Sequence, residues 1–218
     1  MQMLQFLSSN KIYQGDTVTI DLRDQLKLKK QAYVQDEILS TAAILFADKG
    51  FRAITINDIA AGLGYTKSVV YYYFKNKNEI LWQIFNRMYE SYQQSIDEVI
   101  GKSQSPTETL REILYQHALQ VMKRKHWTAI YFRDESELEP EQQNLMRKRK
   151  REYDASIEKV YQEGVKEGVF VDIPSHIAVS GFLGMCNWSH TWFNDNGSHT
   201  AEQIAGYYCS IMSKGYLK

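Results

Sequence analysis

The sequence predicts an all-α protein, with an N-terminal three-helix helix-turn-helix domain followed by a larger C-terminal helical domain. Its 218 residues include three prolines and twelve glycines, which favours long helices over a fold with many turns. Apolar residues recur at helical spacing through most of the chain. No run of about 18 apolar residues occurs, so we expect no segment that spans a membrane.

Composition excludes some broad classes of protein. The formal net charge is zero, so the chain as a whole is not a polybasic nucleic-acid binder, and any basic site must be local. Cys186 and Cys209 have no metal-binding or redox spacing, and we interpret them as reduced core residues of a cytoplasmic protein. The first residues have no charged segment before their apolar residues and thus no clear export signal.

The first helices are expected after an irregular extension. Residues 1–34 are interpreted as a partly disordered arm, and residues 35–80 as the N-terminal three-helix domain. The helical pattern begins at Gln35 and ends at Gly50, which stands where a left-handed cap belongs. A second helix starts after Thr55, which forms a capping-box pattern with Asp58, and it stops at Gly64.

The third helix contains the unusual string "KSVVYYYF", for which Thr66 is the expected N-cap. Because successive residues advance by about 100° around a helix, the string has two faces. Val70, Tyr73 and Phe74 share one face and should point into the core. Tyr71 and Tyr72 should point away from it, so the run of tyrosines is not uniform.

The remaining helices are expected to form a second, C-terminal helical domain over residues 81–218. Asn76 is the expected N-cap of a long helix from about Lys77 to Ile100. Further helices are expected over residues 106–125, 127–134, 140–163 and 174–194. Thr200 should cap the last one.

Two short helices joined by a tight turn predict a helix-turn-helix motif, in which the second helix enters the major groove of duplex DNA. Residues 27–77 contain eight basic and four acidic residues, a local charge of +4. This basic character fits a DNA-binding end. The candidate DNA contacts are Thr55, Thr66, Lys67, Ser68, Tyr71, Tyr72 and Lys77.

Residues 38–81, "ILSTAAILFADKGFRAITINDIAAGLGYTKSVVYYYFKNKNEIL", resemble the DNA-binding domain of the TetR family of bacterial transcriptional regulators. The resemblance covers the whole three-helix module and the start of the next helix. It implies a homodimer that binds an operator in double-stranded DNA and is usually released by a small effector. Tyr72 stands where a histidine is common in the family, and the N-terminal arm is longer than usual.

The C-terminal half should supply the dimer interface and the effector site. The candidate interface residues, which could equally be intramolecular core, are Gly181, Met185, Trp192, Ile204, Tyr208 and Ile211. The candidate effector-binding residues are aromatic, and each could equally be core: Trp82, Phe85, Tyr89, Tyr115, Trp127, Tyr131 and Trp188.

The tail segment "EGVFVDIPSHIAVSGFLGMCNWSHTWF" resembles the branch of the family that senses acyl-CoA thioesters. Members of that branch often have an arginine where this chain has Thr191. The run "RKRKR", residues 147–151, could meet a CoA phosphate or form a solvated helix face.

Two other classes of protein compete with this interpretation. An enzyme is disfavoured because the five histidines are scattered without a metal-binding pair, and no glycine-rich phosphate loop occurs; no cofactor or metal site is expected. The second class is a nonspecific or architectural DNA-binding protein without an effector. It would bind with a steep salt dependence and little sequence preference.

Overall fold

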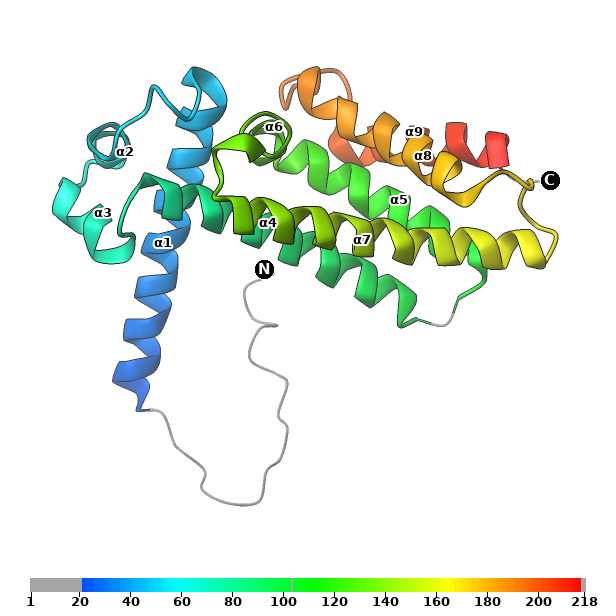
Figure 1. Ribbon diagram of the computed structural model, residues 1–218, viewed down its shortest axis with the longest axis horizontal. Helices are drawn as coiled ribbons and strands as arrows, with labels where there is room; N and C mark the ends of the chain where they lie inside the picture. The colour runs from blue at the N-terminus through cyan, green and yellow to red at the C-terminus, as the bar shows by residue number, and fades with distance from the viewer. Residues whose placement is uncertain (1–20, 103, 217–218) are drawn as a thin grey trace. The chain divides into compact units, whose positions relative to one another are not determined.

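The structure, a computed structural model, describes residues 21–102 and 104–216, and over these residues the predicted all-α class is confirmed (Figure 1). No β-strand occurs in the described part. Its α-helices are α1 (Leu22–Lys49), α2 (Ile56–Gly62), α3 (Lys67–Tyr73), α4 (Lys77–Ile100), α5 (Pro106–Lys123), α6 (Lys125–Arg133), α7 (Pro140–Lys166), α8 (Ser175–Trp188) and α9 (Ala201–Tyr216). Short 3-10 helices occupy Glu135–Glu137 (η2) and Ser189–Thr191 (η3).

Helix α1 begins at Leu22, well before the position expected from the hydrophobic pattern. The prediction of an irregular arm was therefore wrong for residues 22–34, and residues 1–20 lie outside the described part. The segment after Leu22 is rich in leucine, lysine and glutamine and contains neither glycine nor proline, so its helix propensity is high without an apolar stripe. The chain divides into two compact units, residues 1–36 and 37–218.

The helix-turn-helix forms within the second unit as predicted. Gly50 and Gly64 have positive φ angles of 86° and 67°, which few other residues adopt. Thr55 and Asp58 form the capping box of α2. The core beneath α2 and α3 consists of buried side chains from all three helices and the α1–α2 turn: Phe46, Phe51, Ile54, Ile59, Val70 and Phe74.

Helix α5 is the centre of the C-terminal bundle, because it packs against α4, α7, α8 and α9 (Figure 1). Ser105 and Glu108 form a capping box at its start. Its buried face contributes Leu110, Leu114 and Ala118 to one large core that includes side chains of every neighbouring helix. Both cysteines are buried and free, as expected.

Other element ends differ slightly from the expected ones. Helix α7 continues to Lys166, and Gly164 on it lies directly under the ring of Phe170, which leaves no room for a side chain. Helix α8 ends at Trp188 because the chain tightens into η3. Thr200 accepts a hydrogen bond from the Gln203 N–H at 3.3 Å and caps α9 as predicted.

Candidate DNA-binding surface and effector pocket

The outward face of α3 has the arrangement predicted from helical geometry. Val70 and Phe74 are buried, whereas Tyr71 and Tyr72 are 53% and 69% exposed. Thr66, Lys67 and Ser68 at the start of the helix are also exposed. The Thr66 hydroxyl makes no capping hydrogen bond, contrary to expectation. The face thus presents hydroxyl groups, an ammonium group and two phenols.

Lys77 has another role than the one expected. Its ammonium donates to the carbonyl oxygens of Phe51 and Ile54, each at 2.7 Å, and it lies 4.3 Å from the centre of the Phe51 ring. Partial burial lowers its pKa. Lys77 therefore holds the α1–α2 turn, and its hydrogens are not directed at a phosphate.

Thr55 is also engaged within the protein. Its hydroxyl donates to Asp58 Oδ2 at 2.6 Å and accepts from the Asp58 N–H at 3.3 Å. The bonds that the Thr55 hydroxyl and the Thr55 backbone N–H donate to Asp58 Oδ2 lower the pKa of the Asp58 carboxyl. The Thr55 hydroxyl, although exposed, therefore orders the start of α2. The five other predicted DNA contacts apart from Lys77, on α3 and at its N-cap, are also exposed.

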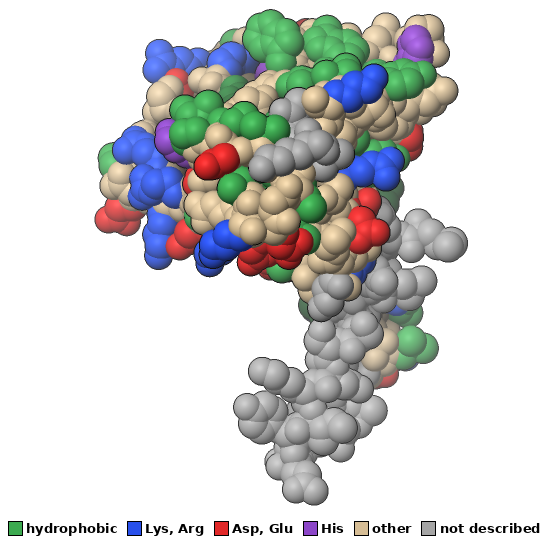
Figure 2. All heavy atoms as spheres, turned by 90° about the vertical axis from the view of Figure 1, so that its right-hand side faces the viewer, with side chains coloured by type: hydrophobic (Ala, Val, Ile, Leu, Met, Phe, Trp, Pro, Cys, Tyr) green, Lys and Arg blue, Asp and Glu red, His purple; other side chains and the backbone are tan. Residues whose placement is uncertain are grey.

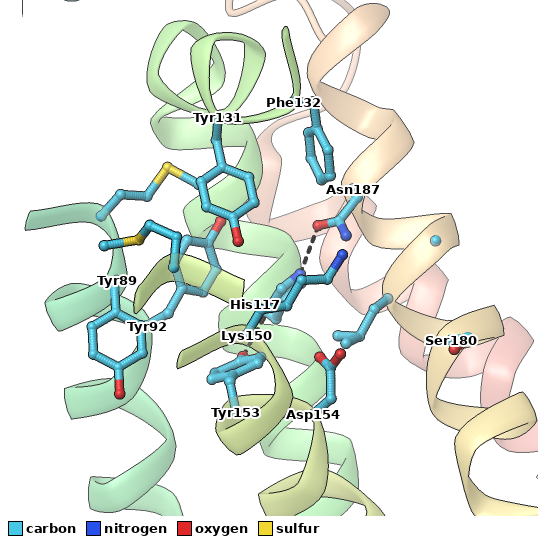
Figure 3. A pocket seen from close by; sticks show the side chains of 14 residues that line it. Tyr89, Tyr92, His117, Tyr131, Phe132, Lys150, Tyr153, Asp154, Ser180 and Asn187 are labelled. Atoms are coloured by element: carbon cyan, nitrogen blue, oxygen red, sulfur yellow. Dashed lines mark hydrogen bonds between the residues drawn. The ribbon is translucent and has the colours of Figure 1, made fainter. Parts of the chain in front are cut away.

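A cavity of about 310 Å³ lies in the C-terminal bundle between α4, α5, α6, α7 and α8 (Figure 3). Most of its lining is apolar or aromatic, which is typical of a small-molecule site. The lining residues are Met88, Tyr89, Tyr92, His117, Tyr131, Phe132, Met146, Lys150, Tyr153, Asp154, Ser180, Leu183, Gly184 and Asn187.

The inner end of the cavity is polar. His117 on α5 is 7% exposed; its Nδ1 lies 2.9 Å from the Tyr153 hydroxyl and its Nε2 lies 2.8 Å from Asn187 Oδ1 (Figure 3). Burial lowers the pKa of His117 to about 4, and the hydrogen bond with Asn187 opposes that change only in part. Burial also raises the pKa of Tyr153 well above its usual value. Both groups are therefore neutral at physiological pH.

The open side of the cavity is formed by exposed residues, among them Phe132, Lys150 and Ser180. Phe132 stacks on His190, with ring centres 5.6 Å apart. Burial raises the pKa of Asp154, and Lys150 one turn earlier on α7 opposes this. A ligand could thus place an apolar group inside and a charged group outside.

Two of the seven aromatic residues predicted to bind an effector, Tyr89 and Tyr131, line the cavity. Phe85 lies behind it against Tyr131, with ring centres 5.4 Å apart. Trp188 was a wrong prediction, since it is 67% exposed on the outside of α8. The other three residues outside the lining are Trp82, Tyr115 and Trp127.

The basic run on α7 is divided between several environments. Arg147 lies 3.7 Å from Glu135, and Lys148 lies 3.7 Å from Glu152. Arg149 donates to Asn86 Oδ1 at 2.6 Å and lies over the ring of Tyr89. Lys150 lines the cavity. The run is therefore not one uniform anion-binding face, and Lys150 is its member at the pocket.

Helices α8 and α9 expose an apolar surface, seen along the upper part of Figure 2. Its exposed large side chains are Ile177, Trp188, Trp192, Tyr207 and Ile211, and Gly181 is also exposed. Trp192 and Ile211 were predicted interface residues. Ile204 was a wrong prediction because it faces the core at 8% exposure, and Met185 and Tyr208 are partly buried against the same core.

The pocket and the helix-turn-helix are joined through α6. Arg133, directly after Tyr131 and Phe132, donates to the Phe46 carbonyl and, at 3.0 Å, to the Ala47 carbonyl at the end of α1. Asp134 holds the same guanidinium at 2.9 Å. One short helix therefore lines the cavity and also contacts α1.

The described residues contain no group of three or more histidine, cysteine, aspartate or glutamate side chains that could hold a metal ion. Among the same residues, no helix is long and apolar enough to cross a membrane.

Comparisons with known proteins agree with both halves of this arrangement. Residues 38–84 match the family model described as "Bacterial regulatory proteins, tetR family". Residues 103–216 match the model described as "Tetracyclin repressor-like, C-terminal domain".

A curated relative, the HTH-type transcriptional repressor KstR2 of Mycolicibacterium smegmatis, is 29% identical over 188 residues, which cover 83% of this chain and 89% of the relative. The structure of the ketosteroid transcriptional regulator KstR2 of Mycobacterium tuberculosis has the same fold, with a TM-score of 0.79 at 23% identity over 84% of this chain and 95% of that one. AibR, solved with isovaleryl coenzyme A and operator DNA, has a TM-score of 0.71 at 26% identity over 81% of this chain and 96% of that one.

Proposed function

Because the chain belongs to the TetR family of bacterial transcriptional regulators, we propose that it is a homodimeric repressor released from a palindromic operator by an acyl-CoA thioester. In this proposal residues 35–80 bind DNA, and residues 81–218 bind the effector and form the dimer. The exposed face of α3 carries the DNA-binding part, and the cavity with its polar inner end carries the effector part.

The α3 face would lie in the major groove with its N-terminal residues nearest the base edges. Lys67 and Ser68 would meet bases or phosphates, and Tyr71 and Tyr72 would lie against the sugar-phosphate backbone. Their exposure, 53% and 69%, supports this assignment, since a large phenol at the surface can reach a partner molecule. Replacing Lys67 by alanine should weaken operator binding and, if it contacts a phosphate, lower the salt slope by about one.

The effector assignment rests on the form of the cavity. At about 310 Å³ it can enclose an acyl group but not a whole coenzyme A, whose charged portion would remain outside. Lys150 stands on the open side, where a thioester's pantetheine arm and phosphates would leave the bundle. AibR, which has a similar fold, was solved with an acyl-CoA, and this supports the proposed class.

The dimer would form across the apolar surface of α8 and α9. Trp188 and Ile211 are large, apolar and exposed on neighbouring helices, and such surfaces are unusual on monomers. The exposed Gly181 would let two copies of α8 approach closely. Replacing Ile211 by glutamate should shift the protein to a monomer in analytical ultracentrifugation.

A selection of genomic DNA fragments with purified protein, repeated with butyryl-, hexanoyl- and octanoyl-CoA, tests the whole proposal. We expect one palindromic site that is lost when a thioester of suitable length is added. A site that persists with every thioester would refute the effector class but not the regulator. Binding without sequence preference would instead support an architectural DNA-binding protein.

A further inference from the structure

Three side chains at the inner end of the cavity form a chain of hydrogen bonds across three helices. Tyr153 comes from α7, His117 from α5 and Asn187 from α8 (Figure 3). The two distances, 2.9 Å from Tyr153 Oη to His117 Nδ1 and 2.8 Å from His117 Nε2 to Asn187 Oδ1, are those of ordinary hydrogen bonds. The positions of the hydrogens in these two hydrogen bonds decide whether Asn187 presents a donor or an acceptor to a ligand.

The buried phenol of Tyr153 fixes the first hydrogen. The phenolic hydrogen needs an acceptor, and His117 Nδ1 is the partner found for that hydroxyl among the described residues. If Nδ1 carried a hydrogen instead, the phenolic hydrogen would be buried without an acceptor, which is costly. Tyr153 therefore donates to Nδ1.

The tautomer of His117 follows. A neutral imidazole has one hydrogen, and because Nδ1 accepts, that hydrogen lies on Nε2. Nε2 then donates to Asn187, which must present its carbonyl oxygen Oδ1. The orientation of the Asn187 amide is thereby set by two neighbours, although an isolated amide could be turned either way.

The Asn187 amide nitrogen remains as a donor facing the cavity. Asn187 lines the cavity, and its side chain uses Oδ1 for the bond to His117. Among the described residues, no side-chain nitrogen or oxygen is both buried and without a partner. The Nδ2 group, which has no acceptor there, is therefore accessible from the cavity.

We propose that Asn187 Nδ2 donates a hydrogen bond to the carbonyl oxygen of the effector, and that Tyr153 and His117 are positioning residues that hold Asn187 in this orientation. This inference rests on the proposed function, because it concerns the same pocket. A neutral carbonyl suits the inner end of the cavity better than a carboxylate. Tyr153, His117 and Asn187 are all uncharged, so none of the three is a counter-ion for a carboxylate. Asn187 thus determines specificity for thioesters over compounds without an acceptor at that position.

The test compares hexanoyl-CoA with S-hexyl-CoA, a thioether in which a methylene replaces the carbonyl. Both keep the same chain length and the same coenzyme A. Isothermal titration calorimetry should show that the wild-type protein binds the thioester about tenfold or more tightly, because the thioether leaves the amide donor unpaired.

Four variants separate recognition of the ligand carbonyl from packing. Asn187→Asp keeps an acceptor for His117 but has no donor for the ligand, and Asn187→Leu removes both. Each should abolish the preference for the thioester while retaining thioether binding. Asn144→Asp, the same substitution at an exposed position of α7 outside the cavity lining, should leave the preference unchanged. Tyr153→Phe frees the tautomer of His117 and should reduce the preference.

The outcomes are distinguishable. Equal wild-type affinities for the two compounds, or an equal loss for both in Asn187→Asp, would overturn this inference and leave the proposed function standing. Binding of neither compound would overturn the effector class. The nitrogen shifts of His117 in ¹⁵N NMR provide a test without ligand: the hydrogen should be on Nε2, and a hydrogen on Nδ1 would refute the chain of donors.

Discussion

His117 should make the stability of this protein depend on pH between about 4 and 6.5. It is buried against Tyr153 and Asn187, and burial lowers its pKa from 6.5 to about 4. The unfolded chain therefore binds a proton on this histidine at pH values where the folded protein does not. The stability that depends on His117 being neutral is fully present above about pH 6.5. It is lost as the pH falls from about 6.5 to about 4.

The magnitude follows from the difference in pKa. A change from 6.5 to about 4 is 2.5 pKa units, and each unit corresponds to about 1.4 kcal/mol. Acidification from pH 7.5 to 4 should therefore lower the free energy of unfolding by about 3 kcal/mol per subunit through His117 alone. This is a large share of the stability of an ordinary domain.

Urea unfolding at a fixed protein concentration, repeated at half-unit steps from pH 7.5 to 4, measures this loss. His117→Gln has no imidazole to protonate, and the difference in unfolding free energy between wild type and this variant should shrink by about 3 kcal/mol over the range. His126→Gln on the exposed side of α6 is the matched control and should keep the wild-type pH dependence.

A parallel pH profile for wild type and His117→Gln would refute this account. It would mean that the pKa of His117 is not lowered in the folded protein, so that the ring is protonated below about pH 6.5. In that pH range a protonated ring would donate from both nitrogens and Tyr153 would have to accept, so the donor chain inferred for Asn187 would hold only at higher pH.

Three further predictions concern other parts of the second unit. Lys77→Met should lower the free energy of unfolding by about 1–3 kcal/mol by circular dichroism, since two carbonyls lose their donor, whereas Lys67→Ala should change it by less than about 0.5 kcal/mol. Gly164→Ala should cost about 1–3 kcal/mol in a thermal melt, because its Cβ would lie 2.1 Å from the Phe170 ring. Gly206→Ala, with open space around it, should not destabilise. Arg133→Ala should reduce the change in operator affinity caused by the effector, measured by fluorescence anisotropy, while leaving effector binding intact.

The exposed face of α3, which we propose binds DNA, was predictable from the sequence because its determinants are local. Glycines with positive φ, capping residues and the 100° spacing of a helix all act within a few residues of one another. The burial of Val70 and Phe74 beneath exposed Tyr71 and Tyr72 followed directly from that spacing. The role of Lys77 did not follow, since its carbonyl partners lie 23 and 26 residues earlier in the chain.

Most of the pocket could not be predicted from the sequence, because it too depends on contacts between residues far apart in the chain. Its polar end joins residues separated by 36 and 70 positions, and no local pattern marks such a meeting. Aromatic residues were reasonable guesses, but a tryptophan on an amphipathic helix can face either the cavity or the solvent, and Trp188 faces the solvent. His117 gave one weak signal, a titratable residue within an apolar helical stretch, which alone indicates a structural histidine more often than a ligand-binding one.

In the proposed function, the effector site and the DNA-binding domain share one short element, and this makes their coupling a physical expectation. Tyr131 and Phe132 of α6 line the cavity, while the next residue, Arg133, donates to the carbonyls at the end of α1. Since α6 has only nine residues, a ligand that displaces its aromatic side chains has little helix in which to absorb the movement before Arg133. If the ligand binds better to one position of α6 and the operator complex requires a different position, the ligand must weaken operator binding. By thermodynamic reciprocity, the operator then weakens ligand binding by the same factor.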